Sequence, residues 1–189
     1  MVITSSKATN PSAIDTMEFR RALGHFATGV TVVTYQPEGI DEFRGTTVNS
    51  FTSVSLEPPL VLVSLGTQTR SAAALRAGSA FTVNVLHHGQ RDLAMRFAVS
   101  VQPDTEVEWE VRAGVPQLAG CGAHFRCVTQ DVHGAGDHVL VVGLVEEFHA
   151  YGHEPLLFYR GAFEHLRDPL AAQPGTDIDL VLGDFPELW

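Results

Sequence analysis

Short runs of β-branched, hydroxyl and aromatic residues recur along the chain and predict a protein built mainly of strands. These runs occupy residues 30–35, 43–65, 81–86, 122–132, 138–148 and 155–163. Val, Thr and aromatic side chains favour extended backbone because they pack well on a pleated surface. The second run is broken at Glu57-Pro58-Pro59, so it predicts two strands joined by a turn. Turn residues at 37–39 and 133–137 predict hairpins after the first and fourth runs.

Three shorter segments have helical patterns. Asp15 followed by Glu18 has the spacing of a capping box, and apolar residues then recur at helical spacing, so we predict a helix from there to near Gly29. Residues 70–78 are rich in Ala and end in Gly, which predicts a short helix with a C-terminal stop. Residues 91–97 have apolar side chains one turn apart and predict a third helix.

Strands outnumber helices, and the helices do not alternate with the strands one for one. This order favours a mainly β fold with short helices, an antiparallel β-barrel that is closed or nearly closed, over a doubly wound parallel sheet. A chain of 189 residues fits one domain. We expect residues 15–167 to form that domain, between a flexible N-terminal arm at 1–14 and an acidic C-terminal tail at 168–189.

Charge and hydropathy exclude several partners. The formal net charge is -10, and such a surface repels the phosphate backbone of nucleic acids. Part of the excess is local, because five acidic residues follow Arg167 with no further Lys or Arg. No apolar run reaches the roughly 18–20 residues of a membrane span, and the N-terminus lacks the pattern of a signal peptide. We therefore expect a cytoplasmic protein that binds neither nucleic acid nor membrane.

The sequence also lacks the motifs of several enzyme classes. It contains no G-x-x-x-x-G-K-[ST], G-x-G-x-x-G, G-x-S-x-G or H-E-x-x-H, which disfavours phosphate-loop enzymes, Rossmann dehydrogenases, α/β-hydrolases and zincins. His149 and His153 are four residues apart, but Gly152 between them favours a loop over a metal-binding helix, so no metal is expected. Cys121 and Cys127 are an even number of positions apart in an apparent strand. We expect two buried free thiols on one face, too far apart for a disulfide.

A cluster of hydroxyl and amide residues lies within the second strand run, at 46–55. Alternation places Thr47 and Asn49 on one face and Thr46 and Ser50 on the other if no bulge intervenes. Inward polar groups need partners, and a bound heterocycle with carbonyl and ring-nitrogen edges would provide them. An edge strand with solvated polar groups explains the same pattern, and the segment alone does not decide between the two interpretations.

Three further segments carry candidate chemistry. Residues 69–71 begin the predicted Ala-rich helix, where free N–H groups and the charge of Arg70 favour an anion such as phosphate. A Ser or Thr at this place also serves as an ordinary helix cap. Residues 136–138 place His138 in a predicted hairpin turn, and residues 158–161 place an Arg in a predicted strand. Taken alone, each of these segments also fits a purely structural role.

In combination, these segments resemble the short-chain flavin reductase family, the reductase components of two-component flavin-dependent monooxygenases. The resemblance extends from about Phe19 to His165 in family order. The matching stretches are Phe19-Arg20-x-Ala22-Leu23-Gly24-x-Phe26-x-Thr28-Gly29-Val30-Thr31-Val32-Val33-Thr34, Thr47-x-Asn49-Ser50-Phe51-x-Ser53-Val54-Ser55-Leu56-x-Pro58-Pro59-Leu60-Val61, Arg70-Ser71, Phe81-x-Val83-Asn84-Val85-Leu86, Gly136-Asp137-His138 and Pro155-Leu156-Leu157-Phe158-Tyr159-Arg160-Gly161.

The resemblance implies an FMN-binding split barrel that works as a homodimer, with the flavin near the subunit interface. Residues implied to line the isoalloxazine, the ribityl chain and their surroundings are Gly45, Thr46, Thr47, Asn49, Ser50, Ser64, Leu65, Gly66, Asn84 and Val85. Those implied to take the flavin phosphate are Arg70 and Ser71. Those implied to lie toward the nicotinamide nucleotide are His138, Tyr159, Arg160 and Gly161. Segments 66–69 and 134–136 depart from the family pattern, which leaves the adenosine side of the site undefined.

The implied activity is that of an NAD(P)H:flavin oxidoreductase. It would reduce FAD or FMN and supply the reduced flavin, by diffusion, to a flavin-dependent monooxygenase. The hydride transfer is chemistry of the two cofactors, so no nucleophile is needed, and we expect His138 to position or polarise rather than to act as an obligatory base. Two alternatives stay open: a flavoprotein with tightly bound flavin that reduces ferric chelates or another acceptor, and a non-catalytic flavin-binding barrel. The choices between FAD and FMN and between NADH and NADPH also stay open.

Overall fold

The computed structural model describes residues 14–98 and 105–166. Within them the chain forms short helices and antiparallel strands, which confirms the predicted mainly β fold. The helices are α1 (Thr16–Leu23), α2 (Arg70–Ala74), the 3₁₀ helix η1 (His88–Gln90) and α3 (Arg91–Ala98). The strands are β1 (Thr28–Gly29), β2 (Thr31–Tyr35), β3 (Arg44–Val48), β4 (Thr52–Leu56), β5 (Pro59–Gly66), β6 (Ala80–Val85), β7 (Trp109–Arg112), β8 (Val115–Leu118), β9 (Ala123–Ala135), β10 (His138–Ala150), β11 (Leu157–Tyr159) and β12 (Ala162–Glu164). The predicted arm, apart from residue 14, and the predicted tail lie outside the described residues.

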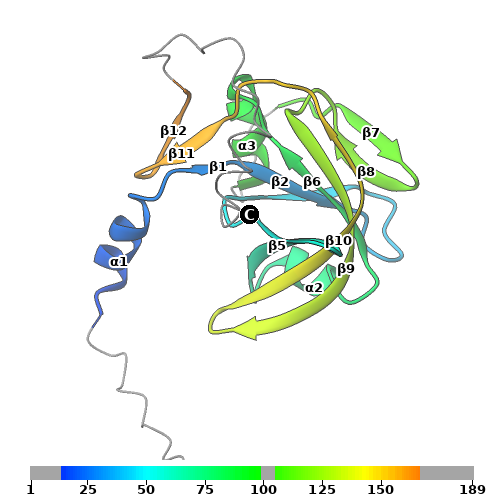
Figure 1. Ribbon diagram of the computed structural model, residues 1–189, viewed down its shortest axis with the longest axis horizontal. Helices are drawn as coiled ribbons and strands as arrows, with labels where there is room; N and C mark the ends of the chain where they lie inside the picture. The colour runs from blue at the N-terminus through cyan, green and yellow to red at the C-terminus, as the bar shows by residue number, and fades with distance from the viewer. Residues whose placement is uncertain (1–13, 99–104, 167–189) are drawn as a thin grey trace, which may run out of the picture.

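A seven-stranded antiparallel sheet with the strand order β3-β2-β6-β9-β10-β5-β4 forms the body of the molecule (Figure 1). Its two edge strands, β3 and β4, follow each other in the chain and are joined only by residues 49–51. Six strand spacings of a flat sheet would separate them by about 29 Å. The link reaches only about 14 Å. The sheet must therefore curl until its edges meet, which produces a barrel that is split between β3 and β4.

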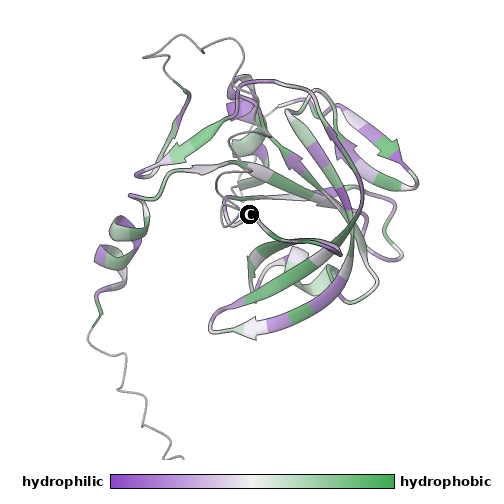
Figure 2. Cartoon of the chain, in the orientation of Figure 1, coloured by the Kyte–Doolittle hydropathy of each residue, from purple (hydrophilic) through white to green (hydrophobic). Residues whose placement is uncertain are grey.

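Two hydrophobic clusters cover the two faces of this sheet. The inner cluster includes Val33, Val63, Phe81, Val83 and Cys127. The second cluster, under α3 and the β7–β8 hairpin, includes Val30, Val32, Leu86, Ala94 and Leu118. Strand β2 contributes to both by alternation, so all of its residues are buried. Each fully buried Val, Leu or Phe side chain in these clusters stabilises the fold by about 1.5–3 kcal/mol relative to an exposed one. Figure 2 shows hydrophobic residues distributed along the strands.

Helix α1 lies apart from the sheet (Figure 1). The side chain of Asp15 accepts hydrogen bonds from first-turn backbone N–H groups, the shorter at 2.8 Å, which confirms the predicted cap. The helix ends at Leu23, earlier than the predicted Gly29, because the chain continues into β1 and pairs with β11. None of its residues is buried, although it carries hydrophobic residues (Figure 2).

Two predicted elements have different bounds. The single strand predicted at 155–163 is wrong, because the segment forms the β11–β12 hairpin. Its turn residues Arg160 and Gly161 have φ values of 51° and 83°, the left-handed pair that a tight hairpin turn requires. Helix α2 ends at Ala74 rather than near Gly78, since the chain turns there to bury Leu75, which is 1% exposed.

One hairpin has no counterpart in the prediction. Strands β7 and β8 pair with each other, and residues 115–118 are all buried. The prediction for the cysteines is also partly wrong. Cys121 precedes β9 and lies in the second cluster, whereas Cys127 lies in the inner cluster, so they do not share a face. Both are buried free thiols, as predicted, and burial raises the pKa of each to about 12.

Among the described residues, no helix is both long and apolar enough to cross a membrane.

Candidate active site at the split of the barrel

The predicted polar cluster lies where the barrel is split. Strand β3 ends at Val48 and β4 begins at Thr52, so the alternation expected through Ser50 is interrupted. The Ser50 hydroxyl donates to the backbone O of Ser64 at 2.9 Å and accepts from its backbone N–H at 3.0 Å. A side chain therefore replaces the backbone ladder across the split. The neighbouring Asn49 is exposed and makes no hydrogen bond with other described residues.

The two faces of β3 have different surroundings. The Thr47 hydroxyl donates to the backbone O of Ala94 in α3 at 2.6 Å. A Cβ at Gly45, on the same face, would lie 2.8 Å from the ring of Phe97, so α3 explains the absence of a side chain there. Thr46 lies on the opposite face, and its side chain makes no hydrogen bond with other described residues. Of these three predicted site residues, Thr46 thus has the side chain that is available to a ligand.

Asn84 is fully buried, and its amide is used within the protein. Its Nδ2 donates to the backbone O of Val32 at 2.7 Å, and its Oδ1 accepts from the backbone N–H of Leu118 at 2.8 Å. The residue therefore joins β2, β6 and β8. The backbone O of Val85 accepts from Gly122 at 2.8 Å. Both residues support the sheet beside the split, and the side chain of Asn84 has no free polar group for a ligand.

Helix α2 begins beside the split. The Thr69 hydroxyl caps it, accepting from the backbone N–H of Ala72 at 3.2 Å. Ser71 is buried, and its hydroxyl lies 3.1 Å from the Thr69 hydroxyl. Arg70 is exposed and makes no ion pair with any described residue. Its guanidinium lines a hollow of about 1330 Å³ between α2, the β2–β3 hairpin and the β7–β8 turn.

His138 is held next to the same region. It opposes Gly66 in the β5–β10 pair, beside the buried Leu65. The backbone N–H of Thr67 donates to the backbone O of Asp137 at 2.9 Å, which ties the turn before His138 to the start of α2. Nδ1 of His138 lies 2.7 Å from Oδ1 of Asp137. This hydrogen bond, with the charge of the ring, lowers the pKa of the Asp137 carboxyl.

The last predicted group lies elsewhere in the chain. Arg160 and Gly161 line a second, smaller hollow together with Arg20, Arg21 and His25. The backbone N–H of Arg160 donates to the backbone O of Gly24 at 2.8 Å, and the ring of Tyr159 meets that of His25 edge-on at 6.4 Å. Strand β5 thus contacts β3, α2 and β10, whereas Arg160 and Gly161 line a different hollow.

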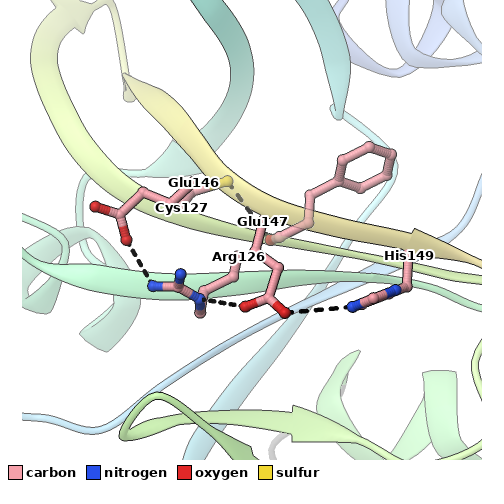
Figure 3. Close-up of polar contacts among 6 residues, drawn as sticks. Arg126, Cys127, Glu146, Glu147 and His149 are labelled. Carbon is pink, nitrogen blue, oxygen red and sulfur yellow. Dashed lines mark hydrogen bonds and ion pairs between the residues drawn. The ribbon is translucent and has the colours of Figure 1, made fainter.

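A further polar cluster on β9 and β10 fits a structural role (Figure 3). Arg126 contacts Glu146 at 2.6 Å and Glu147 at 3.1 Å, and Glu147 also lies 3.3 Å from His149. A register shift between residues 145 and 147 lets both carboxylates reach one guanidinium. His153 instead faces His87, with ring centroids 5.4 Å apart. Over residues 14–98 and 105–166, no group of three or more His, Cys, Asp or Glu side chains is arranged to hold a metal ion.

Sequence reasoning missed the basic and aromatic residues that line the two hollows. Tyr35 and Arg44 line the larger one, and Arg20 and Arg21 the smaller one. The antiparallel pairing of β2 with β3 places Tyr35 opposite Arg44. The two residues were therefore predictable as neighbours, but not as part of a hollow.

The residues at the split fit a planar polar heterocycle that carries a phosphate. The unpartnered side chains of Thr46 and Asn49 provide hydrogen-bonding groups, and Arg70 provides a cation without a partner among the described residues. His138 is the first residue of β10, and its side chain is 47% exposed.

Comparison with known proteins assigns the chain to a family. The family described as flavin reductase like domain matches residues 23–167. An NADH-dependent flavin reductase from Rhodococcus sp is 40% identical over 151 residues, which cover 79% of this chain and 86% of that protein. The reductase subunit HsaB of a flavin-dependent monooxygenase from Rhodococcus jostii (strain RHA1) is 40% identical over 165 residues, covering 85% of this chain and 83% of that one.

A solved structure agrees with this assignment. The NADH:FAD oxidoreductase SgcE6 from Streptomyces globisporus C-1027, in complex with NAD and FAD fragments, superimposes with a TM-score of 0.76 at 39% identity. The match covers 88% of this chain and 99% of that one. The fold, the length of the match and the level of identity agree, and the chain belongs to the flavin reductase-like family.

Proposed function

We propose that this protein reduces a flavin with NADH and supplies the reduced flavin to a separate flavin-dependent monooxygenase. The observation that carries the proposal is the membership of the chain in the flavin reductase-like family, supported by free polar side chains on the elements around the split: Thr46 on β3, Asn49 after it, Arg70 at the start of α2 and His138 opposite Gly66 of β5. Relatives named as NADH-dependent reductases and as reductase subunits of monooxygenases support NADH and such a partner.

The flavin lies across the split in this proposal. Thr46, Asn49 and Ser50 face its ring and ribityl chain, with the backbone of residues 64–66 on the other side. Arg70 takes the phosphate, because a planar guanidinium forms paired hydrogen bonds with phosphate oxygens. Ser71 adds its backbone N–H. Gly45, Thr47, Asn84 and Val85 hold the surrounding strands in place through contacts within the protein.

His138 orients the nicotinamide in this mechanism. When bound, the two cofactors supply the redox chemistry, a hydride passing from the dihydronicotinamide to the flavin. Asp137 accepts from Nδ1 of His138, which fixes the ring and leaves Nε2 free to meet the carboxamide of the nicotinamide. Close orientation and exclusion of water are the contributions the protein makes to such a transfer. Tyr159, Arg160 and Gly161 bind the rest of the nicotinamide nucleotide.

The functional unit in the proposal is a homodimer. Helix α1 exposes Met17, Phe19 and Leu23, each more than half exposed, and none of its residues is buried in the chain itself. Large apolar side chains gathered on one exposed element indicate a protein interface. Residues 159–161 lie beside this helix, so a second copy packed there would bring them toward a shared site. We expect the dimer to work in the cytoplasm, which supplies NADH.

One assay tests the activity. Purified protein is mixed with NADH and either FAD or FMN, and the loss of NADH absorbance is followed at about 340 nm. We expect rapid loss that depends on free flavin, and product formation when a monooxygenase of the two-component class is added. No loss with either flavin would contradict the proposal and favour a binding barrel. Flavin that stays bound through dialysis and is reduced in place would favour the tightly bound alternative.

A further inference from the structure

The smaller hollow, between α1 and the β11–β12 turn, is lined by basic side chains. It measures about 500 Å³, and no carboxylate is among its lining residues, which are Arg20, Arg21, Gly24, His25, Arg160 and Gly161. In a chain whose formal net charge is -10, three guanidinium groups around one hollow form a local region of the opposite sign. The hollow therefore favours an occupant that carries several negative charges.

The guanidinium groups of this hollow are available for such an occupant. Arg20, Arg21 and Arg160 are exposed, and their side chains make no hydrogen bond or ion pair with other described residues. The hydrogen bond with His138 is the main cause that lowers the pKa of the Asp137 carboxyl, and the charge of Arg20 adds to the shift. The hollow is therefore electrostatically coupled to the turn that carries His138.

The hollow lies on one face of α1. Arg20, Arg21 and Gly24 have the spacing of residues that share a helix face, whereas Phe19 and Leu23 lie on another. Gly24 permits the close approach of the β11–β12 turn, because a Cβ there would lie 3.4 Å from the Cα of Arg160. A second copy packed on Phe19 and Leu23 therefore does not need the face that lines the hollow.

The tail of this chain has the complementary charge. Residues 168–189 include no Lys or Arg, and their acidic residues are Asp168, Asp177, Asp179, Asp184 and Glu187. Four of the five fall within residues 177–187, here called the acidic segment. In an extended chain Asp177 and Asp179 would project from one side, about 7 Å apart. Two carboxylates at that spacing can each meet a separate guanidinium.

The described chain ends close to the hollow. Strand β12 follows Gly161 directly, and Leu166, the last described residue, lies within about 17 Å of that turn. From Leu166 to Asp177 the chain can span about 36 Å, so the acidic segment can return to the hollow of its own chain. Exposed ion pairs are individually weak, but a tether raises the effective concentration of the segment.

We propose that the acidic segment binds the basic hollow of its own chain and competes there with the nicotinamide nucleotide. The competition rests on the proposed function, which assigns Arg160 and Gly161 to that nucleotide, whereas the docking does not. Weak pairs exchange between docked and released states, and the apparent affinity for NADH falls with the fraction of molecules whose hollow is open. Salt screens the pairs and releases the segment.

Cross-linking tests the docking without turnover. A carbodiimide joins a carboxylate to a neighbouring amine, and the sequence contains a single lysine, Lys7. In the full chain, Arg21→Lys therefore adds one amine at the hollow. We expect mass spectrometry of the digested product to show position 21 linked to the acidic segment. Arg112→Lys, on β7 at the far side of the molecule from α1 (Figure 1), is the matched control and should give no such link.

Kinetics tests the competition. Asp177→Asn combined with Asp179→Asn should lower the NADH KM about threefold at low ionic strength and leave kcat unchanged, because more molecules have an open hollow. The difference from the unmodified protein should vanish at about 0.5 M salt. Glu106→Gln combined with Glu108→Gln removes the same charge at the same spacing from an exposed segment outside the tail, and should leave the KM unchanged.

Each failure identifies the step that is wrong. No link from position 21 to the acidic segment, or an equal link from position 112, would overturn the docking. A link that joins two chains, seen as a dimer on a denaturing gel, would assign the hollow to the tail of a second copy and overturn the assignment to the same chain. An unchanged KM in the Asp177 and Asp179 variant would overturn the competition. Absence of NADH oxidation by the unmodified protein would contradict the proposed function and leave the cross-linking result valid.

Discussion

Individual polar residues at the split divide into those that hold the protein together and those with free groups. The side chains of Asn84 and Thr47 form hydrogen bonds with backbone groups of neighbouring elements. Arg70 has no partner within the described residues, and His138 has one ring nitrogen engaged and the other free. Buried polar groups need internal partners, whereas a ligand site needs groups left without them. Hydrogen bonding thus separates the two roles where the family motif alone does not.

The role of His138 is open to a kinetic test. We expect His138→Ala to raise the NADH KM or to slow flavin reduction, by about tenfold, because the ring no longer orients the nicotinamide. Asp137→Asn is the matched variant. It removes the charge that fixes the ring, and we expect a smaller effect in the same direction. Steady-state kinetics and single-turnover flavin reduction measure both, and unchanged values for His138→Ala would remove this residue from the site.

The buried His124 predicts a pH dependence of stability. Its Nε2 lies 2.7 Å from the backbone O of Leu118 and must donate, while its buried Nδ1 has no partner, so the folded protein holds a neutral ring. Burial is the main cause that lowers its pKa below the ordinary 6.5. The unfolded chain therefore binds the proton more readily. The contribution of His124 is complete above pH 6.5 and is lost as the pH falls below that value.

The size of this effect is measurable by denaturant unfolding. Between about pH 7 and pH 5 the loss is at most about 2 kcal/mol. His87, whose pKa is also lowered by burial, contributes in the same direction. Replacing His124 with Gln should flatten the profile, and His87→Gln serves as the comparison. A profile for His124→Gln that is as steep as that of the unmodified protein would show that another group titrates.

At the level of the elements, local patterns were predictable and packing was not. The cap at Asp15 and the β9–β10 hairpin depend on neighbouring residues and were predicted. The β7–β8 hairpin was missed because its strands are short and β8 becomes buried only against β2 and β6. The same limit applies to the site. The polar run at 46–55 was recognisable in the sequence, but the contact of α3 with one face of β3 comes from the tertiary fold and explains Gly45.

This packing of α3 on β3 can be tested by paired substitutions. Thr47→Val keeps the shape but removes the hydrogen bond to Ala94, so we expect a loss of about 1 kcal/mol in the free energy of unfolding. Gly45→Ala would place a Cβ 2.8 Å from Phe97 and should cost about 1–3 kcal/mol. Thr46→Val, on the opposite face, is the control. It should weaken flavin binding with little change in stability. A larger flavin Kd for Thr47→Val than for Thr46→Val would place Thr47 against the flavin.

At the scale of the whole molecule, the residues proposed to bind the nicotinamide nucleotide belong to two different parts of the fold. The split of the barrel gathers β3, β5, α2 and β10, whereas residues 159–161 belong to the small sheet of β1, β11 and β12. That sheet and α1 lie at the periphery of the body in Figure 1. A nicotinamide that contacts both groups needs them on facing surfaces. In the proposed homodimer, a second copy docked on the exposed apolar residues of α1 would provide this arrangement.

The proposed dimer predicts a link between association and activity. Phe19→Ala combined with Leu23→Ala removes two exposed apolar side chains, and burying each against a partner is worth about 1.5–3 kcal/mol. We expect the unmodified protein to elute as a dimer in size-exclusion chromatography with light scattering, and the double variant to shift toward monomer with a raised NADH KM. Glu18→Ala, on the same helix, is the control and should remain dimeric. A monomeric unmodified protein with full NADH turnover would contradict the shared site, because one chain alone would then supply every contact that the nicotinamide needs.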